Sequence, residues 1–110
     1  MILAALDRGD RSFLGSTMLF SFQRPVAEIG FWMVPHARGR GLTEAAVALT
    51  IRWGFEHLGL QRVIGLTSPS NTASQAAMER AGMRFERRDR EYEHPIVGRQ
   101  DVVIYASELD

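Results

Sequence analysis

The sequence predicts one domain of the α+β class, with a mixed, mostly antiparallel sheet and a central parallel strand–helix–strand unit. Its 110 residues suit a single domain spanning 1–110. The chain opens with segments rich in strand formers, a long helical pattern follows over 42–58, and another β-rich segment comes directly after it. A strand, a helix and a strand in this order require a right-handed crossover, which makes the two strands parallel.

About three antiparallel strands are expected at the start of the chain. The apolar run 1–6 precedes Asp7-Arg8-Gly9-Asp10, which is typical of a hairpin turn. The segment 12–22 is rich in strand formers and ends before the turn residues Gln23-Arg24-Pro25. The segment 27–33 then alternates between two faces, with Ile29, Phe31 and Met33 on one and Glu28, Gly30 and Trp32 on the other.

Two helices and three further strands complete the predicted order, β-β-β-α-β-α-β-β. Gly59 ends the first helix, and strand 62–67 follows. Asn71 caps an alanine-rich helix over 72–81, and strands over 83–88 and 101–106 close the chain. We expect Trp53 and Phe55 to lie in the core, because both belong to apolar stripes of the first helix. These stripes consist of Leu42, Ala45, Ala46, Leu49 and Trp53 and of Val47, Ile51, Phe55 and Leu58.

Composition excludes several kinds of chemistry. The absence of cysteine excludes disulfides, thiolate zinc sites and cysteine nucleophiles, and the absence of lysine excludes a Walker-type phosphate loop and a Schiff base. Thirteen arginines balance thirteen acidic residues, so no nucleic-acid partner is expected, and the charge run 84–93 is interpreted as a solvated strand and loop. Three scattered histidines indicate no metal site. The sequence shows no membrane span or signal peptide, which favours a cytoplasmic protein without a membrane partner.

The strongest chemical feature is Arg38-Gly39-Arg40-Gly41, between the third strand and the first helix. Glycines let backbone N–H groups face a ligand, and a helix N-terminus adds unpaired N–H groups and partial positive charge. With arginine donors beside it, the turn suits a phosphate or diphosphate. The alternative is a plain strand-to-helix turn with solvated arginines. The glycine spacing does not match a Rossmann fingerprint.

Together with its surroundings, this turn resembles motif A of the GNAT superfamily, the acetyl-CoA-dependent N-acetyltransferases. The family pattern is Gln or Arg, two residues, Gly, one residue, then Gly or Ala. Here it reads His36-Ala37-Arg38-Gly39-Arg40-Gly41, so His36 departs from it. The segments 27–35, 51–63, 70–74 and 79–83 resemble the Rim-type subfamily, whose better-known members acetylate the N-termini of ribosomal proteins. The resemblance extends from about Phe13 to the C-terminus.

The resemblance implies a binding site for acetyl-CoA. The backbone from Arg38 to Thr43 would hold the diphosphate, and the pantetheine arm would lie in a splay between strands 27–33 and 62–67. The residues implied for the cofactor are Trp32, Met33, Val34, His36, Arg38, Gly39, Arg40, Gly41, Leu42, Thr43 and Asn71. Ser74 stands where relatives carry a hydroxyl near the CoA sulfur, and it would donate a proton to the thiolate. Alternatively, Ser74 is only a helix residue beside the Asn71 cap.

Acetyl transfer to an amine requires removal of a proton from the amine and stabilisation of an oxyanion. An α-amino group has a pKa of about 8, so roughly a tenth is neutral at pH 7 and a single carboxylate suffices as the base. Glu28 is the candidate, because it lies on the strand leading into the acetyl pocket; a surface carboxylate is the alternative. His94 and Tyr92 are weaker candidates. A backbone N–H near Met33 or Val34 would stabilise the oxyanion.

We therefore expect an N-acetyltransferase that transfers acetyl directly to a protein N-terminal amine. The alternatives are a small amine acceptor, such as an antibiotic or polyamine, and a CoA-binding or interaction module without turnover. Complete family members carry a strand and one or two helices before the meander. This chain is expected to begin at the second strand of the family fold, with an incomplete acceptor wall. The apolar surface left uncovered predicts a homodimer or low solubility.

Overall fold

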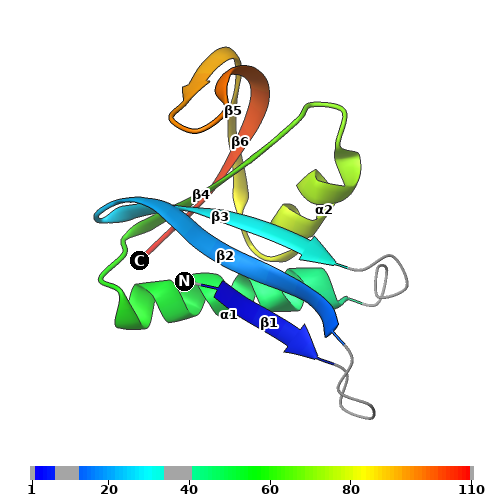
Figure 1. The fold of residues 1–110 in the computed structure, drawn as a ribbon, viewed down its shortest axis with the longest axis vertical. Coiled ribbons are helices and arrows are strands. Elements are labelled where there is room, and N and C mark those ends of the chain that lie inside the picture. The colour runs from blue at the N-terminus through cyan, green and yellow to red at the C-terminus, as the bar shows by residue number, and fades with distance from the viewer. Residues whose placement is uncertain (1, 7–12, 34–40, 110) are drawn as a thin grey trace.

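A computed structural model of the protein describes residues 2–6, 13–33 and 41–109, with side chains described over 14–33 and 41–109. In this part of the chain, strands and helices follow one another in the order that the sequence predicts (Figure 1). They are β1 (Ile2–Leu6), β2 (Phe13–Gln23), β3 (Val26–Met33), α1 (Leu42–His57), β4 (Arg62–Thr67), α2 (Thr72–Arg80), β5 (Arg84–His94) and β6 (Gly98–Glu108). The described strands form one sheet in the order β1-β2-β3-β4-β6-β5. Among its ladders β3 and β4 pair in parallel, and the others are antiparallel, which confirms the predicted fold class.

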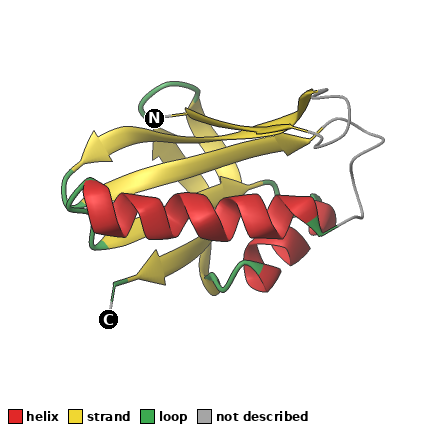
Figure 2. Cartoon of the chain, turned by 90° about the horizontal axis from the view of Figure 1, so that it is seen from below, coloured by secondary structure: helices red, strands yellow, loops and turns green. Residues whose placement is uncertain are grey.

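Both helices lie on one face of the sheet (Figure 2). Helix α1 packs against β2 and β3, and α2 packs against β4 and β5. We call this the covered face and the opposite one the open face. Residues directly opposite each other in a ladder share a face, and the ladders pair Phe20 with Glu28 and Glu28 with Ile64. The open face therefore carries Met18, Phe20, Glu28, Trp32 and Ile64.

The core lies between the covered face and the helices. Its buried members come from both layers: Leu19, Ala27, Ile29, Val47, Ile51, Leu60, Val63, Met78, Met83, Val103 and Tyr105. Gly65 permits close packing of α2, because a Cβ there would lie 2.4 Å from the Met78 sulfur. Such a contact is far shorter than atoms tolerate, so only glycine fits without rearrangement.

Only one of the two apolar stripes on α1 is buried. Val47 and Ile51 are buried, and Phe55 packs against the core from a half-buried position. The expectation for Trp53 is wrong: this residue is 36% exposed, Leu49 is 55% exposed, and the Trp53 ring contacts His57. A helix resting on one face of a sheet buries one stripe, and the neighbouring stripe turns toward solvent.

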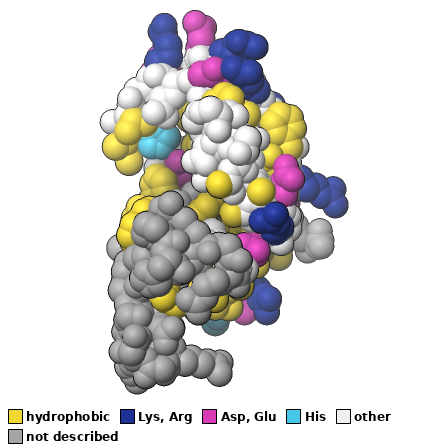
Figure 3. Space-filling model, turned by 90° about the vertical axis from the view of Figure 1, so that its right-hand side faces the viewer, with side chains coloured by type: hydrophobic (Ala, Val, Ile, Leu, Met, Phe, Trp, Pro, Cys, Tyr) yellow, Lys and Arg dark blue, Asp and Glu magenta, His cyan; other side chains and the backbone are white. Residues whose placement is uncertain are grey.

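The last two strands are longer than the sequence predicts. β5 runs to His94 and β6 begins at Gly98, so a tight hairpin replaces the loop expected after 88. β5 is an edge strand, and its charged residues lie largely exposed, where opposite charges meet across the ladder. Arg88 contacts Asp101 at 2.7 Å, and Arg99 contacts Glu93 at 3.2 Å. Basic and acidic side chains intermix at this end of the molecule (Figure 3), as expected for a solvated charge run.

Candidate active site

Strands β3 and β4 separate partway along their length. Their parallel ladder pairs Val26 with Arg62 and ends where Ile29 pairs with Gly65. Beyond that point β3 continues to Met33 while β4 stays paired with β6 as far as Thr67 (Figure 1). The expected splay between these strands is confirmed. It opens toward the N-termini of α1 and α2, which begin at Leu42 and Thr72.

A cavity of about 420 Å³ lies where β3 ends and both helices begin; we call it the helix-end cavity. Five residues predicted to contact the cofactor line it: Trp32, Met33, Gly41, Thr43 and Asn71. Gly41 precedes the first turn of α1 with φ of +74°, a conformation that favours glycine. Ser74 also lines this cavity. Leu42 is half-buried and is not among the described lining residues.

The remaining predicted cofactor residues, Val34, His36, Arg38, Gly39 and Arg40, lie outside the described residues. The structure also places residues in the helix-end cavity that the sequence did not predict as cofactor contacts: Phe31, Glu44, Ala73, Ala77 and Arg80. Two of these are charged. Glu44 lies in the first turn of α1 and Arg80 in the last turn of α2, so only the folded chain brings them to one cavity.

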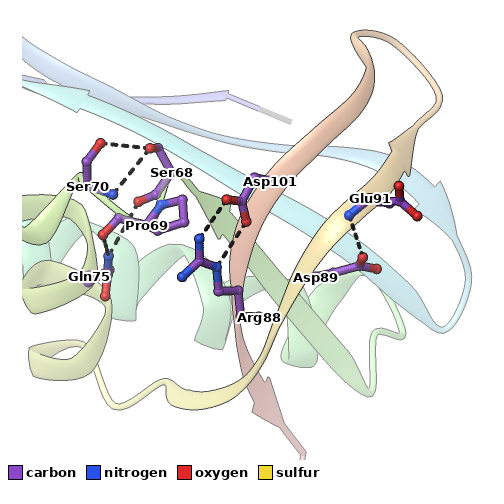
Figure 4. A network of polar contacts seen from close by, with 8 residues as sticks. All are labelled: Ser68, Pro69, Ser70, Gln75, Arg88, Asp89, Glu91 and Asp101. Atoms are coloured by element: carbon purple, nitrogen blue, oxygen red, sulfur yellow. Dashed lines mark hydrogen bonds and ion pairs between the residues drawn. The ribbon is translucent and has the colours of Figure 1, made fainter.

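The start of α2 is built by local hydrogen bonds. Asn71 caps the helix, as predicted: its Oδ1 accepts a hydrogen bond from the Ser74 N–H at 3.1 Å. The preceding turn is held by Gln75, whose Nε2 donates to the Pro69 carbonyl at 3.0 Å, and by a 2.9 Å contact between Ser68 and Ser70 hydroxyls (Figure 4). This turn fixes where Asn71 and Ser74 enter the helix-end cavity.

A second polar cluster lies on the open face of the sheet. Glu28 and His94 are both buried, at 8% and 9% exposure, and Glu28 Oε2 lies 3.0 Å from His94 Nε2. The sequence predicts Glu28 as the base and gives His94 as a weaker candidate. The hairpin between β5 and β6 brings His94 to it across 66 residues of chain.

The hydrogen bonds of His94 identify its tautomer. The Ile96 N–H donates to His94 Nδ1 at 3.0 Å, so Nδ1 is an acceptor without a proton. The remaining ring proton is then on Nε2, which donates to the Glu28 carboxylate. Burial raises the pKa of Glu28, and the His94 hydrogen bond opposes this increase.

Tyr92 completes the cluster. Its ring centroid lies 6.4 Å from that of His94. Burial raises the Tyr92 pKa above its ordinary value, and the Glu28 charge adds to this effect. The phenol is therefore neutral near pH 7. All three base candidates taken from the sequence thus gather on the open face.

Two cavities flank the Glu28–His94 pair, and both residues line each of them. One, of about 470 Å³, also contacts Tyr92 and Glu93; the other, of about 550 Å³, also contacts Leu66 and Asp101. Ser74 lines neither, so the two predicted catalytic residues do not share a cavity. Glu28 is one residue short of the point where the β3–β4 ladder ends. It therefore stands at the closed end of the splay that opens toward the helix-end cavity.

Within the described residues, no group of three or more histidine, cysteine or acidic side chains is placed to hold a metal ion. In the same residues, no helix has the length and apolar character needed to cross a membrane.

Several curated proteins resemble this sequence over part of its length. "Putative ribosomal N-acetyltransferase YdaF" of Bacillus subtilis is 34% identical over 80 residues, which cover 73% of this chain and 44% of YdaF. "FsC-acetyl coenzyme A-N(2)-transacetylase" of Aspergillus fumigatus is 38% identical over 63 residues, which cover 57% of this chain and 27% of that protein. The chain spans less than half the length of either relative.

A solved structure shares the fold. The ribosomal-protein-S5-alanine acetyltransferase from Vibrio fischeri superposes with a TM-score of 0.86 and 20% identity, over 99% of this chain and 61% of that one. The family model described as an acetyltransferase (GNAT) domain matches residues 1–84, well over half of the sequence. The chain therefore belongs to the GNAT acetyltransferase family.

Proposed function

We propose that the protein is an N-acetyltransferase that uses acetyl-CoA and acts on a protein N-terminal amine. One observation carries the proposal: buried Glu28 stands at the closed end of a splay whose other end is the N-terminus of α1. A diphosphate fits a helix N-terminus preceded by a positive-φ glycine such as Gly41. The six residues from Glu28 to Met33 span ~16 Å along β3, which leaves an extended arm room to reach the carboxylate.

In the proposed reaction, one bond forms, one bond breaks and two protons move. The amine nitrogen attacks the thioester carbonyl carbon, a C–N bond forms, and the C–S bond then breaks to release the CoA thiolate. The amine proton passes to Glu28 and on to solvent, and the thiolate takes up a proton from water. Ser74 lines the helix-end cavity and not the cavities beside Glu28, so its role as a proton donor stays a prediction. A carboxylate whose pKa is raised by burial accepts a proton more readily than an exposed one near neutral pH.

Two features support a protein N-terminus as the acceptor. The name of the Bacillus subtilis relative refers to a ribosomal acetyltransferase. An α-amino group also requires little help to lose its proton, which suits a site with a single buried carboxylate. The name of the Aspergillus relative refers to an N(2) position, so a small-molecule amine is the second candidate. A cytoplasmic location and a homodimer stay predictions.

The test separates binding from turnover. Calorimetric titration with acetyl-CoA measures binding, and release of free thiol measures transfer to a panel of amines. We expect binding, and thiol release with peptides bearing a free N-terminus but not with the same peptides acetylated at that end. Turnover only with small amines assigns the second candidate. Binding without thiol release on any amine identifies a non-catalytic module, and absence of binding contradicts the proposal.

A further inference from the structure

We propose that His94 is a positioning residue: it holds the Glu28 carboxylate through Nε2–H, and the β5–β6 hairpin fixes the tautomer that does so. The inference deepens the proposed function and rests on it for the part that concerns catalysis. Its geometric part, the tautomer and the contact, stands independently.

The contact joins two distant parts of the chain. Glu28 lies in β3, in the middle of the sheet, and His94 is the last residue of β5, at the sheet edge. Their side chains meet at 3.0 Å with about nine-tenths of each residue buried. A buried carboxylate without a donor is costly, so this hydrogen bond stabilises one orientation of Glu28.

The backbone of the β5–β6 hairpin determines which nitrogen of the His94 ring carries the proton. The N–H groups of Ile96 and Val97 both point to His94 Nδ1, at 3.0 and 3.4 Å. A proton on Nδ1 would face these donors, so the tautomer with Nδ1–H is disfavoured and the tautomer with Nε2–H is favoured. The Nε2–H group then orients the Glu28 carboxylate.

Nothing else in the described lining of the two flanking cavities performs this task. The charged or titratable side chains there, besides the pair itself, are Tyr92 and Glu93 from β5 and Asp101 from β6. Asp101 is held by Arg88 at 2.7 Å. From β2 and β4, Phe20 and Ile64 contribute uncharged side chains. Among these described groups, only His94 is seen to donate a hydrogen bond to Glu28.

The catalytic test compares two substitutions of His94. His94→Phe keeps a ring and removes the donor, and His94→Gln keeps a side-chain N–H. We expect kcat with the best amine to fall about 10- to 100-fold in His94→Phe and to recover largely in His94→Gln. KM for acetyl-CoA should not change. The acidic limb of the pH–kcat profile should move to higher pH in His94→Phe, because the lost hydrogen bond had lowered the Glu28 pKa. An unmoved limb, or equal loss in both variants, contradicts a positioning role.

A second measurement needs neither a variant nor activity. Nitrogen-15 NMR of the labelled wild-type protein at pH 7 should show His94 Nδ1 as an unprotonated nitrogen and Nε2 as a protonated one. Two protonated nitrogens, or the reverse tautomer, overturn the inference. If no amine supports thiol release but the predicted tautomer is found, the proposed function fails while the geometric part holds. Carbon-13 titration of Glu28 in His94→Phe then replaces kinetics, with an upward pKa shift expected and no shift contradicting the role.

Discussion

The two faces of the sheet differ in how far their side chains are exposed to solvent. On β2, Leu19 points to the covered face and is 1% exposed, whereas Met18 points to the open face and is 39% exposed. The open face also leaves Trp32 exposed, at 50%. It nevertheless holds the buried Glu28–His94 pair. The covered face therefore supplies most of the stability, and the open face supplies the candidate chemistry.

Each face also contains a buried pair of polar side chains, but only the pair on the open face contains a group that can titrate near neutral pH. On the covered face, Thr17 and Thr50 hydroxyls hydrogen-bond between β2 and α1, and neither group titrates near neutral pH. On the open face, the pair contains a carboxylate whose pKa is raised. In the described part of the chain, no buried side-chain nitrogen or oxygen lacks a hydrogen-bond partner. A polar pair on the covered face locks the layers together, while the pair on the open face can exchange protons.

The largest expected effect is on catalysis at the open face. Glu28→Gln removes the proposed base and should lower kcat about 10²- to 10⁴-fold while acetyl-CoA affinity is unchanged. The control is Glu56→Gln on α1, an exposed carboxylate that should leave kcat as it is. Full activity of Glu28→Gln would dismiss Glu28 as the base.

Glu28 also makes stability depend on pH. Its folded-state pKa is raised, so the folded protein binds the proton more tightly than the unfolded chain. Stability from this group is present below the unfolded pKa and is lost as pH rises through the folded pKa. Denaturant unfolding at several pH values should show this decline in the wild type and not in Glu28→Gln. Equal pH dependence in both proteins contradicts the assignment.

The next largest effect is on the free energy of unfolding. It is tested by substituting two neighbouring residues of β2 that point to opposite faces. Leu19→Ala should lower the free energy of unfolding by about 2–5 kcal/mol, because it leaves a cavity under α1. Met18→Ala is the matched control and should cost less than about 1 kcal/mol, since Met18 is already partly exposed. Urea denaturation of both variants measures the difference. Comparable losses would mean that the open face is covered in solution.

Substituting the two members of the buried threonine pair should lower stability by different amounts. Thr50 donates to the Ala46 carbonyl at 2.8 Å, so Thr17 must donate to Thr50. Thr50→Val leaves the Thr17 hydroxyl buried without an acceptor and should cost about 1–3 kcal/mol. Thr17→Val leaves the Ala46 bond intact and should cost about 1 kcal/mol or less. Thermal unfolding of the two variants gives the order, and a reversed order refutes the assigned donor.

The smallest effect concerns Tyr105 of the core. Its hydroxyl donates to Glu79 at 2.7 Å, and burial together with this carboxylate raises the Tyr105 pKa to about 12. Tyr105→Phe should cost about 1 kcal/mol, because Glu79 is exposed and regains water. Absorbance titration should show a phenol ionising near 12 in the wild type that disappears in this variant. Persistence of that transition would assign it to Tyr92 instead.

Local patterns explain which parts of this fold the sequence could predict. The alternation around Ile29, the helical spacing after Gly41 and the Asn71 cap each depend on residues close in the chain. The register of β5 depends instead on pairing with β6, and its dense charges resemble a loop. Trp53 was misplaced because apolar spacing alone does not say which stripe faces the sheet.

The candidate site shows the same limit. Glu28 was found because its strand leads into the splay, but its partner His94 comes from a hairpin whose position only the folded sheet defines. Glu44 and Arg80 both line the helix-end cavity for the same reason. Hydrogen bonds between residues far apart in the chain leave no periodic pattern that a single sequence reveals.

The cofactor's place in the splay can be tested by a crystal structure of the protein soaked with acetyl-CoA. We expect the diphosphate against the first turn of α1 and the thioester carbonyl in the gap between β3 and β4, on the side of Glu28. A diphosphate bound elsewhere, or a thioester directed away from Glu28, contradicts this placement.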